Sequence, residues 1–265
     1  MKKIVAIPLL VLTLAACDSK DDAASTAKGQ DGAEASAPEA AAAGGTAAAE
    51  RLDCRAVNAR PKSGADVAGV TLGMAVDDAF KAVACSDPRL VVELTPPRPD
   101  GYRSIVGERE GEQFNVQLRG VSGQEQVVEI NRILNYGAGQ EPVFDATLRQ
   151  LGTKYGTFVR TDYPGAADES YKAVRRLDGA TVTSLDDPLA RGCPYENEDQ
   201  CGLSVTVNIG RAQTNPALAR GLQVIMQDPR ITRRQTEIAS RSAQAATQQR
   251  QAQEVQAAAD RAPKL

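Results

Sequence analysis

Apolar residues recur at helical spacing in two separate stretches of the chain. In residues 75–84 the residues at i, i+4 and i+7 share one face of a helix: Val76, Phe80 and Val83. Between Pro142 and Gly156 a second apolar face is formed by Phe144, Leu148, Leu151 and Tyr155. Proline is common at the first position of a helix and glycine just after its end. The pattern therefore predicts two amphipathic helices.

Strict alternation of apolar and polar residues marks two other stretches, as is typical of half-buried antiparallel strands. Residues 113–119 place Phe114, Val116 and Leu118 on one face. Residues 203–210 do the same with Leu203, Val205, Val207 and Ile209. Weaker strand patterns occupy residues 90–94, 102–106, 127–134, 157–160, 171–177 and 222–226. Each predicted helix is thus followed by about four predicted strands.

This order predicts an α+β domain over residues 51–229, built from two similar halves at 51–136 and 142–229. Each half would pack a short helix on an antiparallel sheet of about four strands. Because one helix covers only one face of a sheet, we expect each half to leave its other face open, unless the two sheets join. An open sheet face is the place where we expect a partner to bind.

The last segment, residues 230–265, is rich in Gln, Ala and Arg and has no glycine, and its only proline is Pro263. These residues predict one long helical tail. Its apolar stripe has heptad spacing but ends in alanines: Ile231, Ile238, Ala245, Ala252 and Ala259. Alanine buries little surface, so this stripe would stabilise a self-associating coiled coil only weakly. We expect the first two turns to dock on the domain and the rest to project.

The first fifty residues have a different composition. Residues 1–16 combine a basic start with an apolar run that is shorter than the roughly 20 residues of a membrane-spanning helix. They predict a secretory signal peptide. Residues 17–50 are mostly small or acidic, so they bury too little apolar surface to offset the entropy of ordering. We interpret them as a flexible tether.

At the end of the leader, Leu14-Ala15-Ala16-Cys17 resembles the lipobox of bacterial lipoproteins. The resemblance implies that Cys17 is acylated and becomes the N-terminus, which anchors the protein in the cell envelope facing the periplasm. Asp18 is similar to the inner-membrane retention signal of enteric lipoproteins, but other bacteria use different rules, so the choice of membrane stays open. The alternative is an ordinary signal peptide followed by an incidental cysteine.

Four cysteines remain after Cys17, and an even number in an exported chain predicts two disulfides. Three pairings are possible. We favour Cys54–Cys85 with Cys193–Cys201, because each pair then lies within one half. A zinc site is the weaker interpretation, since the chain has neither a C-x-x-C motif nor a histidine.

The composition also argues against several classes of function. The chain has no histidine, which removes the commonest general base and excludes Ser-His and Cys-His catalysis. Its formal net charge is −3, so it lacks the basic surface of a nucleic-acid-binding protein. Residues 120–123, Gly-Val-Ser-Gly, lack the final glycine of a nucleophile elbow and predict a turn. We therefore expect a protein that is not an enzyme and that needs no cofactor.

Two acidic segments and one lysine are candidate binding sites. Glu108, Glu110 and Glu112 suit a charged turn better than a cation site. The segment between Cys193 and Cys201 holds Tyr195, Glu196, Glu198 and Asp199, too few oxygen ligands for calcium but suitable for a recognition loop. Lys172 is interpreted as solvated.

Gly69-Val70-Thr71-Leu72-Gly73-Met74, followed by a short helix and a sheet, resembles a group of small envelope and secreted proteins. The group includes the beta-lactamase-inhibitor-protein fold and the small lipoprotein of the outer-membrane assembly machine. Ala75 stands where that group has a capping Ser or Thr. The resemblance implies a binding role: an interaction protein of the envelope with a protein partner, or alternatively an inhibitor of an enzyme in the same compartment.

Overall fold

The computed structural model describes residues 52–59, 65–98, 101–161, 168–193 and 199–260. Its helices are α1 (Cys54–Asn58), α2 (Val76–Ser86), α3 (Phe144–Tyr155) and α4 (Pro229–Ala259). Its strands are β1 (Asp66–Val67), β2 (Val70–Thr71), β3 (Val91–Leu94), β4 (Tyr102–Arg109), β5 (Glu112–Arg119), β6 (Gln126–Asn135), β7 (Val159–Arg160), β8 (Asp168–Arg176), β9 (Cys201–Arg211) and β10 (Ala219–Gln227). The predicted α+β class is therefore confirmed.

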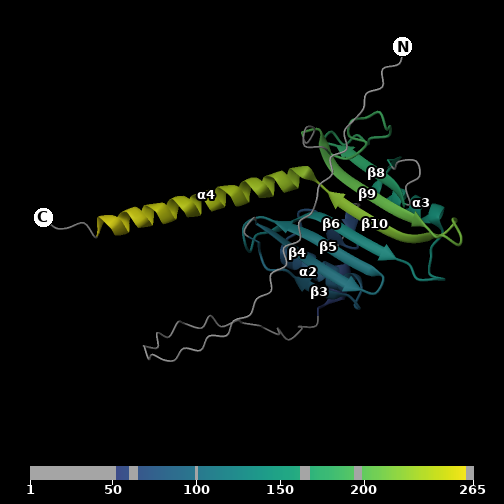
Figure 1. The fold of residues 1–265 in the computed structure, drawn as a ribbon, viewed down its shortest axis with the longest axis horizontal. Coiled ribbons are helices and arrows are strands. Elements are labelled where there is room, and N and C mark those ends of the chain that lie inside the picture. Colours follow the sequence, from purple (N-terminus) through teal and green to yellow (C-terminus); the bar gives the residue numbers. More distant parts are fainter. Residues whose placement is uncertain (1–51, 60–64, 99–100, 162–167, 194–198, 261–265) are drawn as a thin grey trace, which may run out of the picture. The chain divides into compact units, whose positions relative to one another are not determined.

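Eight of these strands form one antiparallel sheet in the order β3-β4-β5-β6-β10-β9-β8-β7. The four strands after α2 are neighbours of one another, and so are the four strands after α3. The groups meet where β6 pairs with β10, with Leu134 opposite Leu222. Figure 1 shows the strands running side by side across this junction. The two predicted sheets are thus joined into one.

The apolar core lies on one face of this sheet. Phe114, Val116 and Leu118 of β5 are fully buried there, as their alternation predicted. The same core cluster contains Val83 of α2 and Phe144 of α3, so both helices pack on this face. Both begin without a side-chain cap, so their position depends on packing rather than on capping bonds.

A hairpin and a short helix precede α2, and the sequence pattern did not reveal them. The hairpin pairs β1 with β2, and its turn places Ala68 and Gly69 at φ of 51° and 89°. Asp66 stabilises it, because its carboxylate accepts hydrogen bonds from the Gly69 N–H at 2.9 Å and from the ammonium of Lys154 on α3 at 3.0 Å. Residues 69–74, predicted as the approach to a helix, therefore form a strand and a turn.

Both predicted disulfides are present. Cys54–Cys85 joins α1 to α2 across 31 residues of sequence, and Cys193–Cys201 closes a separation of 8 residues before β9. The chain thus uses the pairing in which each bond lies within one group of helix and strands.

The second face of the sheet is covered at the end formed by β7, β8 and β9. A small cluster of buried apolar residues packs against β7, β8 and β9: Val159, Val174, Val182, Leu189, Ala190 and Cys201. The residues after β8 thus form a second, smaller core on this face. The prediction that each half leaves one face open is wrong for the strands after α3, because this segment folds over β7–β9.

The C-terminal helix α4 packs on the domain through its first turns. It contacts β5, β6 and β9, and Gln235 is buried, where its amide nitrogen donates to the side-chain oxygen of Gln126 at 2.6 Å. Residues 240–256 are exposed. Among the described residues, no helix is both long and apolar enough to cross a membrane.

Candidate functional site

Four of the residues predicted to carry function lie outside the described part of the chain. This is the case for Cys17 and for Tyr195, Glu196 and Glu198 of the predicted recognition loop. Asp199 is described, and its exposed carboxylate accepts a hydrogen bond from Nη2 of Arg233 on α4 at 2.8 Å. The C-terminal end of that loop is thus tied to the helical tail.

The carboxylates of Glu108, Glu110 and Glu112, considered above as a cation site, do not lie together. Glu112 is buried and bound by arginines, whereas Glu108 and Glu110 are exposed. Among the described residues, no group of three metal-ligating side chains lies close enough to hold an ion. Of the two interpretations, the geometry favours the charged turn.

Lys172 was predicted to be solvated, and this prediction is wrong. The side chain is half-buried on β8, and its ammonium donates a hydrogen bond to the carbonyl of Arg191. Burial lowers the pKa of this lysine. The sequence did not show this because Arg191 belongs to the segment that folds over β8.

In the part of the chain that the structure describes, the small cluster leaves open the section of the second sheet face that spans β4, β5, β6, β10 and part of β9. Directly opposed residues of antiparallel strands share a face, so the register identifies the side chains that lie on it. They are dominated by carboxamides: Gln113, Asn115, Gln117, Asn131, Asn135, Asn208, Gln223 and Gln227. We call this surface the amide face. The alternation of polar and apolar residues predicted the outward-facing carboxamides of β5. Which residues of the other strands lie beside them follows only from the register of the sheet.

Hydrogen bonds link these side chains into two groups that cross the strands. In the first, Glu129 of β6 accepts bonds from Gln117 of β5 at 2.9 Å and from Gln227 of β10. In the second, Asn208 of β9 donates to Gln223 of β10 at 2.9 Å, and Gln223 donates to Asn131 of β6 at 3.1 Å. Bonds of this kind hold the amides in fixed orientations, so less side-chain entropy is lost on binding.

Glu129 is a carboxylate bonded to the carboxamides of this surface. Burial raises its pKa, and the bond from Gln227 opposes that rise. Its two amide partners compensate the cost of placing a charge on a half-buried face.

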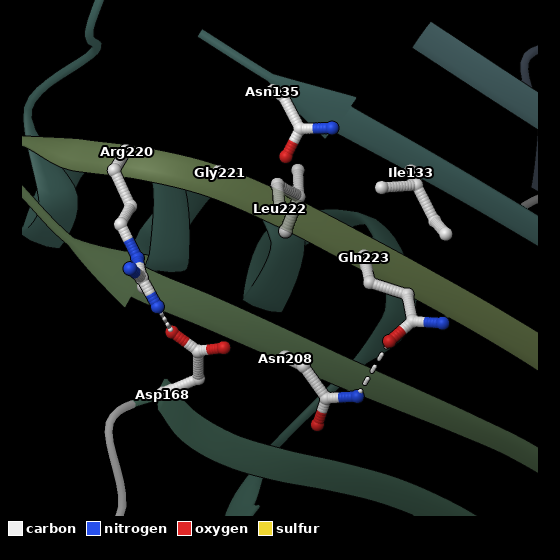
Figure 2. A pocket seen from close by; sticks show the side chains of 9 residues that line it. Ile133, Asn135, Asp168, Asn208, Arg220, Gly221, Leu222 and Gln223 are labelled. Atoms are coloured by element: carbon white, nitrogen blue, oxygen red, sulfur yellow. Dashed lines mark hydrogen bonds and ion pairs between the residues drawn. The ribbon is translucent and has the colours of Figure 1, made fainter. Parts of the chain in front are cut away.

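A hollow of about 260 Å³ opens on the amide face next to the second group of linked amides. Its lining includes two glycines that lie opposite each other, Gly210 of β9 and Gly221 of β10. One end of it is bounded by Arg220, whose Nη2 lies 2.6 Å from Oδ1 of Asp168. Figure 2 shows this pair and the linked Asn208 and Gln223 around the hollow.

The lining of the hollow is polar and carries no net charge. Its side chains are three carboxamides, two apolar residues and one internally neutralised ion pair, and none is a cysteine, serine, lysine or histidine. A carboxamide both donates and accepts hydrogen bonds. The hollow therefore suits a neutral polar group, such as a peptide unit or a side-chain amide.

Comparison with family models, with curated proteins and with solved structures finds no match to this chain.

Proposed function

We propose that this protein is a membrane-anchored envelope lipoprotein whose α+β domain is a non-catalytic protein-binding module. The observation that carries the proposal is the amide face, with its linked side chains and its hollow. Its partner would be another protein of the envelope, and Cys17 would carry the lipid that holds the module at the membrane.

A protein surface suits the amide face because peptide groups and polar side chains match carboxamides in hydrogen bonding. Protein interfaces commonly carry about one hydrogen bond per 100–200 Å² and exclude unpaired charges from their centre. The centre of the amide face has a single carboxylate, Glu129, which is already paired with two amides. Docking would therefore desolvate few charges.

We also propose that the domain is a tandem of two similar halves, α2 with β3–β6 and α3 with β7–β10. Two features support this: each helix precedes its four strands in the chain, and each set of four strands is contiguous in the sheet. The junction of β6 and β10 would then be the place where the halves meet, and the amide face spans it.

The alternative function is inhibition of an enzyme in the periplasm or envelope. It is supported by the Cys193–Cys201 disulfide, which closes a short segment, and by the bond from Arg233 that holds Asp199. An inhibitor would present this segment, rather than the amide face, to an active site. The two functions thus predict different binding surfaces.

Capture of partners from envelope extract by the full chain, followed by quantitative mass spectrometry, distinguishes these surfaces. The face variant is Asn115→Arg with Gln227→Arg, two exposed positions on the amide face. The matched control is Thr153→Arg with Gln213→Arg, two exposed positions on α3 and in the loop after β9. We expect one stoichiometric partner that is lost with the face variant and kept with the control.

Two other outcomes would contradict the proposed binding mode. A partner kept by the face variant but lost when residues 194–200 are replaced by a Gly-Ser turn would support the inhibitor, provided that the partner is an enzyme whose activity falls on binding. Equal capture by all variants would remove the amide face as the binding surface. The lipid anchor is tested separately, because Cys17→Ser should abolish the mass increase of acylation and the recovery in the membrane fraction.

A further inference from the structure

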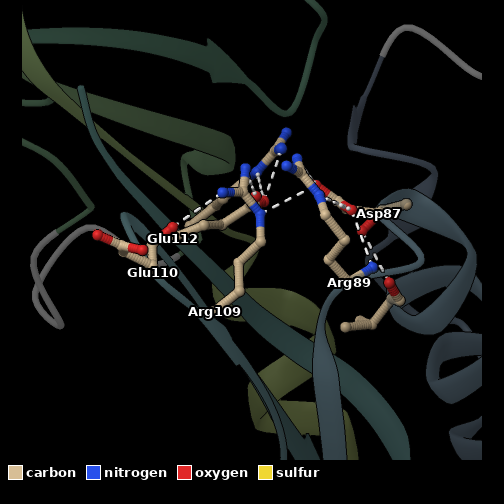
Figure 3. Close-up of polar contacts among 8 residues, drawn as sticks. Asp87, Arg89, Arg109, Glu110 and Glu112 are labelled. Atoms are coloured by element: carbon tan, nitrogen blue, oxygen red, sulfur yellow. Dashed lines mark hydrogen bonds and ion pairs between the residues drawn. The ribbon is translucent and has the colours of Figure 1, made fainter. Parts of the chain in front are cut away.

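A cluster of arginines and carboxylates lies where β4 turns into β5 and where α2 leads to β3. Glu112 is fully buried, and Arg109 and Arg132 bind its two oxygens at 2.6 and 2.7 Å. Asp87 accepts a hydrogen bond from Arg89 at 2.7 Å, and its Oδ2 forms an ion pair with Nε of Arg109 at 2.9 Å. Arg109 thus bridges the two carboxylates. Figure 3 shows the guanidinium groups gathered around them.

The sequence places this cluster through one tight turn. Arg109 and Glu112 are opposed across the β4–β5 hairpin, and Gly111 in its turn has a φ of 76°. A Cβ on Gly111 would lie 2.8 Å from the carbonyl oxygen of Asn135, so only glycine fits. The turn therefore fixes the Arg109 guanidinium beside the end of β6.

The charges of the cluster do not balance. Three guanidinium groups face two carboxylates, and hydrogen bonds from Arg89 hold the pKa of Asp87 well below its usual range, so Asp87 is ionised. Within these contacts one positive charge is left over, because the carboxylate of Glu110 nearby is not bound to the guanidinium groups. Arg89 carries much of it toward solvent, because 72% of its side chain is exposed.

A hollow of about 720 Å³ adjoins this excess charge. Arg89 and Arg109 line one side, and Leu134 with Tyr136 adds apolar surface. Glu110 is the one acidic residue of the lining, and Figure 3 shows its carboxylate pointing away from the guanidinium groups. We call this cavity the arginine hollow.

We propose that the arginine hollow binds a ligand with a single carboxylate attached to an apolar body. Guanidinium groups form planar, paired hydrogen bonds with carboxylates. One carboxylate balances the one excess charge, while Leu134 and Tyr136 accept the apolar part. A doubly charged phosphate would exceed that charge and meet the field of Glu110. The end of a peptide chain and a free organic acid share this chemistry.

The test is isothermal titration of the full chain with N-acetyl-alanyl-leucine, with its C-terminal amide, with hexanoate and with inorganic phosphate. We expect the peptide acid to bind and the amide to bind at least about tenfold more weakly, because hydrogen bonds to charged groups are the stronger ones. Binding of hexanoate equal to that of the peptide acid would identify any organic acid as the ligand. Failure of hexanoate to bind would identify a peptide end.

Arg89→Gln is the decisive variant, since its exposed side chain leaves the bridge between Arg109, Asp87 and Glu112 in place. It should weaken binding of the peptide acid about tenfold. Arg241→Gln, which removes the same charge from an arginine 79% exposed on α4, should leave binding unchanged. Circular dichroism and thermal unfolding verify that both variants fold.

Three results would overturn the proposal: equal affinity for the acid and the amide, equal affinity of the Arg89→Gln and Arg241→Gln variants, or tighter binding of phosphate than of the carboxylate. None of them bears on the amide face. The arginine hollow lies at the end of the β4–β5 hairpin, and the proposed docking surface is tested with other variants. The two proposals therefore fail independently.

Discussion

Gly210 lies directly opposite Gly221 on the neighbouring strand, and both glycines line the hollow on the amide face. A Cβ on Gly210 would come within 2.5 Å of both Nε of Arg220 and Oδ1 of Asp168. The ion pair thus occupies the position that a methyl group would take. The absence of a side chain at Gly210 therefore lets the Arg220–Asp168 ion pair lie at the edge of the proposed binding surface.

Gly210→Ala should displace the ion pair that bounds the hollow while leaving the fold intact. The Cβ would meet Nε and Cγ of Arg220 and Oδ1 of Asp168, which belong to flexible, half-exposed side chains that can move aside. Loss of an exposed ion pair costs up to about 1 kcal/mol, and replacing a strand glycine returns roughly 0.5–1 kcal/mol. We expect the free energy of unfolding in urea to change by less than about 1 kcal/mol, and capture of the envelope partner to fall.

Gly152→Ala is the matched control, because a Cβ at that position of α3 meets nothing within 4 Å. It should raise stability by about 1 kcal/mol through helix propensity and leave partner capture unchanged. Undiminished capture by Gly210→Ala would show that the hollow takes no part in docking.

Removal of the Cys54–Cys85 disulfide should destabilise the domain more than removal of Cys193–Cys201. The first closes a separation of 31 residues and the second only 8. Loop-closure entropy predicts losses of about 3.5 and about 2.5 kcal/mol, respectively. Urea denaturation of the two double Cys→Ser variants measures this difference. A larger loss for the shorter loop would indicate that the segment over β7–β9 depends on its disulfide for packing.

Truncation of α4 at two positions should distinguish the contribution of its docked first turns to stability from that of its exposed remainder. A chain ending at Ser240 keeps the buried Gln235 and its bond to Gln126, while residues 241–256 are exposed in the intact helix. We expect a melting temperature within a few degrees of the full chain. A chain ending at Asp228 exposes the surface under Gln235 and should melt lower. Equal melting of both truncations would mean that the docked turns add nothing to stability.

The alternation of β5 and the two helices could be predicted because each depends on local periodicity. Phe114, Val116 and Leu118 are buried as predicted, and α3 spans the residues from Phe144 to Tyr155. The pairing of Leu134 with Leu222 could not be predicted, because a strand pattern shows which face is apolar but not which strand lies beside it. The sequence therefore did not decide whether the two sheets join.

The two hollows also depend on neighbours that a sequence pattern does not identify. Gly210 and Gly221 are eleven residues apart in sequence and become a pair only through the register of β9 and β10. Arg89, Arg109 and Glu112 come from two turns that meet in space. The burial of Lys172 depends on a segment with no periodic pattern at all. The hollows and polar clusters of this protein thus arise from contacts between elements, which a single sequence does not encode by spacing.

Glu129→Gln should change how the stability of the domain depends on pH. Burial raises the pKa of Glu129 in the folded chain above its ordinary value of 4.5, so the folded state binds this proton more tightly than the unfolded state. The stabilisation from protonation is fully present below the unfolded pKa and is lost as pH rises through the folded pKa. The glutamine variant has no such proton. Urea denaturation from pH 4 to pH 7 should therefore show wild type losing stability relative to the variant as pH increases, while Glu93→Gln, at an exposed position of β3, corrects for the change in net charge. A difference that stays constant across this range would mean that the bonds from Gln117 and Gln227 fully offset the burial of the carboxylate.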